Sequence, residues 1–346
     1  MNSFGRIFRI AIFGESHGES VGVNIDGCPA GLPLAVDDFM PDIERRKGGT
    51  QKGTTPRKED DLPIFKSGIF NNKTTGAPIT ILFENNNTRS TDYEKQRAVP
   101  RPGHADFVAH EKFGGNEDFR GGGHFSGRLT VALVAAGVIA KKLLAVINAS
   151  PEGTPDPPSS IHVHADILEI GGETDLEKGL QRAIEAKDSI GGIVSCSVTG
   201  LPVGLGEPFF DSVESLLSHA VFAIPAVRGV EFGTGFAAAK MFGIEHNDAI
   251  EDKSGKTKTN HAGGIVGGIT NGNELVFRIA IKPTSSTPKE QQTLNWESGE
   301  VAPFSVKGRH DLCIALRVPV VLEAVTALVI VDLMLLEQRT HRIIDK

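Results

Sequence analysis

The chain has 346 residues, of which 39% are hydrophobic and 23% charged, a composition typical of a globular protein long enough to bury a substantial core. The formal net charge of −7 excludes a broad nucleic-acid or membrane-surface role. Three widely separated cysteines form no CxxC pair, so neither a zinc site nor a disulfide framework is expected. This cysteine usage, and an N-terminus without a signal-peptide pattern, indicate a cytoplasmic protein.

The periodicity of apolar residues predicts the elements in chain order. They are two strands in Phe4–Ile25, a short helix in Asp37–Lys47, a strand in Ala77–Phe83, a long loop in Glu84–Pro102, a helix in Arg128–Val146, a strand in Ile161–Ile170, a helix in Leu176–Ala186, a strand in Gly192–Thr199, a helix in Val213–Ala223, a strand in Glu274–Lys282 and a last helix in Val320–Gln338. The proline-rich segment Ser150–Ser160 is a connector. Strands and helices do not alternate regularly, which favours an α+β fold over a doubly wound sheet.

Two apolar stretches, Leu129–Ile147 and Val318–Leu336, approach the length of a membrane span. A lysine pair interrupts the first and two carboxylates interrupt the second. Because a span needs about 20 predominantly apolar residues with few charges, we expect two buried helices of a soluble core and no membrane partner.

Two short loops carry a histidine suited to proton transfer near neutral pH. The first is Gly-Glu-Ser-His-Gly, with His17, between the two N-terminal strands. The second is Arg-Pro-Gly-His-Ala-Asp, in which His104 lies two residues before a carboxylate. Taken alone, the first loop is more often a histidine hydrogen-bonded in a turn, and the second is as well explained by a capped turn. His162 and His164 lie two apart on a predicted strand and are interpreted as exposed strand residues, so no metal is expected.

Several segments could bind anions. A basic run contains Arg45, Arg46, Lys47 and Lys52, although such a run alone is more often a solvated face. Three glycines, Gly121 to Gly123, lead into a helix, whose N-terminus favours phosphate. Paired glycines near residue 267 could lie flat against a planar ligand. The segment Lys-Pro-Thr-Ser-Ser at 282–286 offers an ammonium group and hydroxyl donors for a phosphate. The motif Gly-Arg-His-Asp at 308–311 adds a cation, an imidazole and a carboxylate. Each of these could also be an ordinary turn.

Together these motifs resemble the chorismate synthase family, over residues 4–338. In chain order they are GESHG, the RRK…TT loop, RPGHAD, RGGGxxSGR, GLGEP, EHND, NHAGGIVGG, KPTSS and GRHD. The resemblance implies a single domain over residues 1–346, a β-α-β sandwich with helices packed between β-sheets, assembled as a homotetramer. It also implies conversion of 5-enolpyruvylshikimate 3-phosphate to chorismate and phosphate by 1,4-anti elimination. This is the last common step to the aromatic amino acids, and it requires reduced flavin mononucleotide (FMN) without net redox change.

The resemblance also assigns residue roles. His17 would protonate the departing phosphate, His104 would serve the protonation state of the flavin, and Asp311 would help remove the ring proton. Substrate anions would be held by Arg45, Arg46 and Arg128, with Lys47 and Lys52 at positions usually occupied by Arg. The flavin contacts would be His124, Phe125, Ser126, Ala226, Gly267, Lys282, Pro283, Thr284, Ser285, Ser286 and Arg309.

The chain departs from the family pattern at the flavin contacts. His124 and Phe125 stand where the family commonly has Arg and Ser, and Pro225 precedes the matching Ala226. We expect His124 still to face the flavin or the substrate phosphate. No Rossmann fingerprint is visible, so NADPH is expected only as an indirect source of reducing equivalents through an external flavin reductase. Two rival functions remain at this point: a flavin oxidoreductase with net hydride transfer, and a non-catalytic module that binds phosphorylated metabolites.

Overall fold

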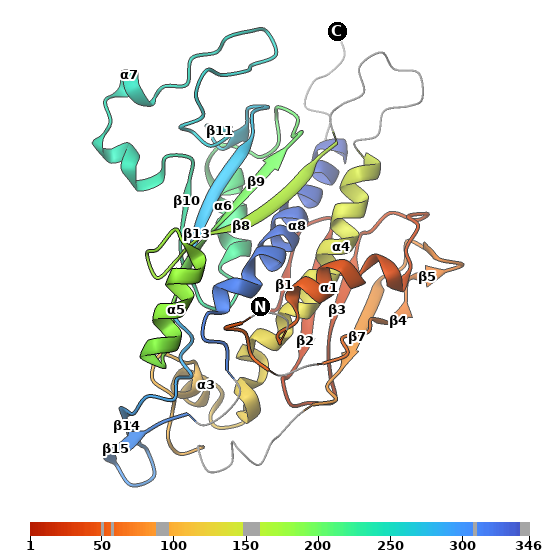
Figure 1. Ribbon diagram of the computed structural model, residues 1–346. Coiled ribbons are helices and arrows are strands. Elements are labelled where there is room, and N and C mark those ends of the chain that lie inside the picture. Colours follow the sequence, from red (N-terminus) through yellow and green to blue (C-terminus); the bar gives the residue numbers. More distant parts are fainter. Residues whose placement is uncertain (50–51, 57–58, 88–96, 148–159, 307–309, 340–346) are drawn as a thin grey trace.

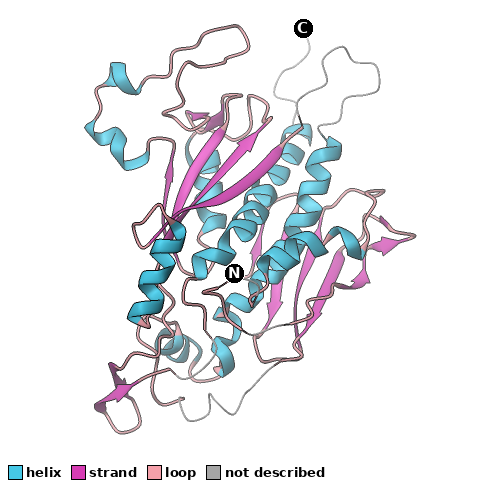
Figure 2. Ribbon diagram, in the orientation of Figure 1, coloured by secondary structure: helices cyan, strands magenta, loops and turns pink. Residues whose placement is uncertain are grey.

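The computed structural model describes residues 1–346 except 50–51, 57–58, 88–96, 148–159, 307–309 and 340–346. Two antiparallel sheets enclose a layer of helices (Figures 1 and 2). This arrangement confirms the predicted α+β class with helices packed between sheets. The connector Ser150–Ser160 and the middle of the loop Glu84–Pro102 lie outside the described residues.

The first sheet comes from the N-terminal part of the chain and has the order β1-β2-β3-β7-β4. Its strands are β1 (Ser3–Phe4), β2 (Arg9–Gly14), β3 (Ser20–Asp26), β4 (Ile64–Ser67) and β7 (Ile79–Glu84). Val21, Val23 and Ile25 alternate along β3 and are fully buried, which is the period-2 pattern of a strand with one face on the core. The predicted pair of strands in Phe4–Ile25 is therefore confirmed, with the His17 loop between them.

The second sheet has the order β10-β13-β9-β8 and lies on the other side of the helices (Figure 1). Its strands are β8 (His162–Ile170), β9 (Gly192–Thr199), β10 (Val227–Phe232) and β13 (Leu275–Ile281). Leu275, Phe277 and Ile279 are buried, as the alternation in Glu274–Lys282 predicted. The chain leaves β13, a central strand of this sheet, directly into the Lys-Pro-Thr-Ser-Ser segment, so the sheet positions that segment at the end of the strand.

Two long helices, α4 (Thr130–Ile147) and α8 (Val318–Arg339), form the centre of the molecule. Helix α4 packs on the first sheet, α8 packs on the second, and the two pack on each other. They approach closely at Gly137, where a Cβ would lie 2.2 Å from the Cβ of Ala324. Both are long and apolar enough to cross a membrane, but 72% of the apolar window in the first and 94% in the second are buried inside the protein, as in core helices.

The remaining elements are shorter and mostly surround this sandwich. The helices are α1 (Met40–Arg46), α3 (Asp106–Phe113), α5 (Leu176–Ala186), α6 (Val213–Val221) and α7 (Gly243–His246), and the small sheets are β5 (Ile69–Phe70) with β6 (Lys73–Thr74), β11 (Ile265–Val266) with β12 (Ile269–Thr270), and β14 (Gln291–Asn295) with β15 (Glu300–Phe304). The bounds of α5 and β9 match the predicted ranges.

Candidate active site

A cavity of about 470 Å³ opens between the two halves of the sandwich, within the size range of small-molecule sites. Segments far apart in sequence meet there: the loop after β2, the start of α4, the segment after β13 and the turn before α8. Among its described lining residues, cationic side chains outnumber carboxylates, which favours an anionic ligand. The cations are Arg46, Lys47, Arg101, Arg128, Arg228, Lys282 and Arg317, and the carboxylates are Glu59, Asp61 and Asp311.

His17 lines this cavity against the three-glycine loop. The residue is 8% exposed, and a Cβ at Gly121 would lie 2.5 Å from the Cδ2 atom of the ring. The two loops are tied together, because the backbone N–H of Ser16 donates to the carbonyl of Gly123 at 3.1 Å. Gly121, Gly122 and Gly123 all have positive φ angles, a run that favours glycine. The loop therefore holds the imidazole by close backbone contact.

The three-glycine loop differs from the prediction in its place relative to α4. The turn from Gly127 to Leu129 lies between them, so the three glycines do not themselves form the start of that helix. Its glycines instead form a wall shared by two imidazoles: Gly121 contacts His17, and a Cβ at Gly122 would lie 3.1 Å from the ring of His104.

His104 precedes α3 and is held by its neighbours. Its Nδ1 atom lies 2.5 Å from Oδ1 of Asp106, and the same carboxylate accepts from Nε and Nη2 of Arg101, each at 2.7 Å. Although burial works to raise the pKa of Asp106, hydrogen bonds from Arg101 and His104 hold it far below its usual range. Asp106 therefore stays ionised beside the imidazole.

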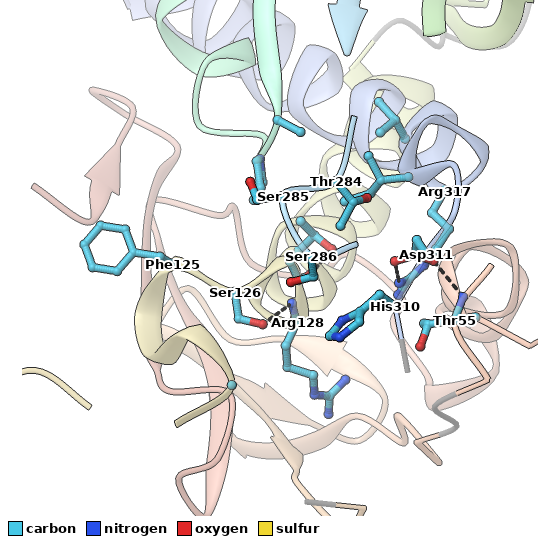
Figure 3. Close-up of a pocket in the computed structure, with 18 of the residues that line it drawn as sticks. Thr55, Phe125, Ser126, Arg128, Thr284, Ser285, Ser286, His310, Asp311 and Arg317 are labelled. Carbon is cyan, nitrogen blue, oxygen red and sulfur yellow. Dashed lines mark hydrogen bonds and ion pairs between the residues drawn. The ribbon is translucent and has the colours of Figure 1, made fainter. Parts of the chain in front are cut away.

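Asp311 and His310 enter the cavity from the turn before α8 (Figure 3). Asp311 accepts from the backbone N–H of Thr55 at 2.8 Å and from Arg317 at 3.1 Å. Burial and the nearby Arg101 lower the pKa of His310, against the effect of Asp311. Its Nε2 atom is buried and has no hydrogen-bond partner among the described residues, so a ligand in the cavity could supply one.

Arg46 and Arg128 are buried side chains in the cavity wall, and they share Asp61. Arg46 donates to Asp61 at 3.1 Å, and Arg128 pairs with the other carboxylate oxygen. Burial works to raise the pKa of Asp61, but the two guanidinium groups keep it below its usual value. The φ angle of Asp61 is +50°, a left-handed backbone that non-glycine residues rarely adopt. This hub, Asp61 with its partners Arg46 and Arg128, holds the two guanidinium groups at defined positions in the cavity wall.

The segment after β13 supplies hydroxyl and ammonium donors. Nζ of Lys282 donates to the carbonyl of Gly103 at 2.9 Å and to Ser285 at 2.8 Å, and Ser286 accepts from Arg101 at 3.3 Å. The hydroxyl of Thr284 is buried without a partner among the described residues. These groups converge on the cavity and suit a phosphate or a polar ring edge.

The structure gathers most of the predicted site residues at this cavity. They are His17, His104, Asp311, Arg46, Lys47, Arg128, Phe125, Ser126, Ala226, Lys282, Pro283, Thr284, Ser285 and Ser286. The side chain of Phe125 points away from His310 and Ser286 in Figure 3. Arg309 lies outside the described residues.

Four predicted residues do not line the cavity. Arg45 pairs with Glu323 and Asp42, and Lys52 donates to Gln181 at 3.3 Å. Gly267 lies in the turn between β11 and β12. Nδ1 of His124 donates to the carbonyl of Gly14 at 2.8 Å, and the ring lines a neighbouring apolar cavity. His124 thus ties the three-glycine loop to the loop that carries His17.

Reasoning from the sequence missed several residues of the site. Asp61 and Arg317 were not selected, and Thr55 and His310 belonged to selected motifs but were given no role of their own. The motif around residues 308–311 already contained His310, but its burial and its unpaired nitrogen depend on the fold. Asp61 carries no local pattern, because its partners lie 15 and 67 residues away.

Comparisons with known proteins agree with this arrangement. The family model described as chorismate synthase matches residues 8–335. Proteins named chorismate synthase are 71% identical in Chitinophaga pinensis (99% of each chain), 45% in Dehalococcoides mccartyi (96% of each) and 42% in Methanocaldococcus jannaschii (97% of this chain and 96% of the relative). A crystal structure of chorismate synthase has a TM-score of 0.71 at 25% identity, over 97% of this chain and 93% of that chain. The chain therefore belongs to the chorismate synthase family.

Proposed function

We propose that this protein is a lyase that converts 5-enolpyruvylshikimate 3-phosphate to chorismate and phosphate by 1,4-anti elimination, with reduced FMN as cofactor. The observation that carries the proposal is the joint placement of His17, His104 and Asp311 on one cation-lined cavity in a member of this family. A module that only binds phosphorylated metabolites would leave this set of proton-transfer groups without a use.

The cavity fits the proposed cofactor. The residues that would hold FMN are Ser126, Ala226, Lys282, Pro283, Thr284, Ser285 and Ser286. Ala226 has a φ of +74° and accepts from the backbone N–H of Lys282 at 2.9 Å, so the two flavin-binding segments are joined. The unpaired hydroxyl of Thr284 is a donor that the fold itself does not use. When bound, reduced FMN supplies electron density to the substrate, which no side chain can do.

The side chains supply proton transfer and charge. His17 donates a proton to the departing phosphate, where negative charge develops. His104 holds a proton for the flavin, and Asp311 assists removal of the ring proton. Arg46 and Arg128 act through the positive potential of the wall, because Asp61 and neighbouring carbonyls already engage their guanidinium groups. Lys47 lines the cavity, but its Nζ atom donates to Oε1 of Glu44 at 2.6 Å, so it would contact a substrate anion by leaving or sharing that pair. Arg45 and Lys52 would reach one only by rearranging.

Cofactor supply and assembly follow the family expectation. We expect NADPH to act only through an external flavin reductase in the cytoplasm.

A homotetramer of this one domain, residues 1–346, would also cover exposed apolar side chains outside the core. These include Phe209 (87% exposed), Phe210 (93%), Phe236 (84%) and Ile244 (91%).

Anaerobic turnover tests the proposal. The purified protein and 5-enolpyruvylshikimate 3-phosphate are mixed in three separate reactions. The first contains oxidised FMN, the second chemically reduced FMN, and the third oxidised FMN with NADPH. We expect phosphate and chorismate in equal amounts only with reduced FMN. Flavin binding without release of phosphate under any condition would contradict the proposal, and turnover driven by NADPH alone would contradict the external reductase.

A further inference from the structure

The tripeptide His-Ala-Asp occurs twice in the chain, with two different geometries. At residues 104–106 the imidazole lines the cavity and its Nδ1 atom lies 2.5 Å from Asp106. At residues 164–166, on strand β8, the imidazole is exposed and its Nε2 atom lies 2.6 Å from Asp166. The same residues therefore present opposite ring nitrogens to the carboxylate, and the fold determines which.

Asp106 can only accept at His104. Its Oδ2 atom accepts from the backbone N–H of Arg101 at 3.0 Å and from Nε at 2.7 Å, and its Oδ1 atom accepts from Nη2 at 2.7 Å. A carboxylate held in this ionised form has no proton to give. Nη2 of Arg101 also lies 3.0 Å from Nδ1 of His104, but the carboxylate oxygen is closer, at 2.5 Å. Two acceptor atoms approach this closely only with a proton between them, so Nδ1 of the ring carries the proton.

The other side of the ring is also fixed. A Cβ at Gly122 would lie 3.2 Å from Nε2 of His104, so the backbone of the three-glycine loop confines this edge while leaving it without a side chain in the way. We propose that Asp106 is a positioning residue that fixes the Nδ1–H tautomer of His104 and so makes Nε2 the atom that exchanges protons in the cavity. This inference rests on the proposed role of His104 in catalysis.

The substitution Asp106→Asn tests it with little change in shape. An amide nitrogen facing Nδ1 donates, which forces the ring proton to Nε2. We expect kcat to fall by roughly 10²- to 10⁴-fold, the range for loss of a correctly protonated acid–base group, while KM and FMN affinity stay within about three-fold. Asp106→Glu restores a carboxylate and should recover at least about ten-fold of that loss. Asp166→Asn, in the exposed copy of the tripeptide, is the matched control and should leave kcat unchanged.

A second measurement does not depend on activity. Nitrogen NMR of protein with isotope-labelled histidine, without ligands and above neutral pH, reports which ring nitrogen carries the proton. The signal of His104 is identified by its loss in His104→Gln. We expect Nδ1–H in the wild type and Nε2–H in Asp106→Asn. If Asp106→Asn does not fold, the tautomer of His104 in the wild type is by itself enough to support or overturn the positioning role of Asp106.

The outcomes separate the inference from the proposed function. An Nε2–H tautomer in the wild type, or an Asp106→Asn variant with unchanged kcat, overturns the inference. The expected tautomers in a wild type that does not release phosphate would instead support the positioning role of Asp106 and reject the elimination reaction.

Discussion

Replacing Asp61 by alanine is expected to lower the free energy of unfolding by about 3–5 kcal/mol, because two buried guanidinium groups lose their shared counter-charge. Asp61 is 3% exposed, and its partners Arg46 and Arg128 are 2% and 6% exposed, so water cannot replace the carboxylate. Alanine also tolerates the left-handed φ of +50° less well than aspartate does. Chemical denaturation at a fixed protein concentration, followed by far-ultraviolet circular dichroism, measures the loss.

The adjacent Asp60 provides a matched control. It is exposed, so Asp60→Ala should change stability little. Asp61→Asn keeps the size and suits the left-handed backbone, and should lose less than Asp61→Ala. A loss for Asp61→Ala no larger than that for Asp60→Ala would show that the hub contributes nothing to stability.

The effect of Asp61 should also depend on pH. The folded state lowers the pKa of Asp61 below the unfolded value of about 3.9, so its stabilisation is complete above that value. The stabilisation is lost as the pH falls toward the folded pKa. The difference in stability between the wild type and Asp61→Ala should therefore shrink on acidification below about pH 4.

Gly121→Ala is expected to lower kcat by about 100-fold. The new Cβ would lie 2.5 Å from Cδ2 and 2.6 Å from Nε2 of His17, so the ring has to move by the order of 1 Å, which is enough to misplace a proton donor. The φ of +61° adds a backbone cost of about 1 kcal/mol. Steady-state kinetics with reduced FMN, beside a circular dichroism spectrum of the folded variant, measures the effect.

Gly172→Ala separates the effect of the new contact with His17 from the backbone cost of a positive φ. Gly172 also has a positive φ, +82°, but no atom lies within 4 Å of a Cβ placed there. This control carries the backbone cost without a contact at the site, and its kcat should equal that of the wild type. A Gly121→Ala variant that is folded and fully active would show that the glycine wall does not position His17.

The long elements could be predicted because their patterns are local. The mostly apolar sequence of α8 reflects burial on nearly all sides, and the alternation in β13 reflects burial on one face. Both elements appear at the expected places. The motif order also predicted most of the lining residues. These features depend on residues close together in sequence.

The rest of the site could not be predicted, because it depends on contacts between distant segments. The three-glycine loop was expected to lead directly into a helix, whereas a separate turn follows it, and Gly121 and Gly122 face the rings of His17 and His104. Arg45 and Arg46 are adjacent in sequence, yet Arg45 pairs with Glu323 on α8 and Arg46 is buried against Asp61. The two side chains leave α1 in different directions, and the packing of α1 on the core determines which partner each one reaches.

A crystal structure of the protein with FMN and 5-enolpyruvylshikimate 3-phosphate would test the central claim most directly. We expect both molecules in the cavity lined by His17, His104 and Asp311, with the FMN phosphate near the segment Lys282 to Ser286. We expect His124 to stay on the carbonyl of Gly14, outside the cavity that holds the two ligands. Flavin bound outside this cavity, or His124 turned to bulk solvent, would contradict the account.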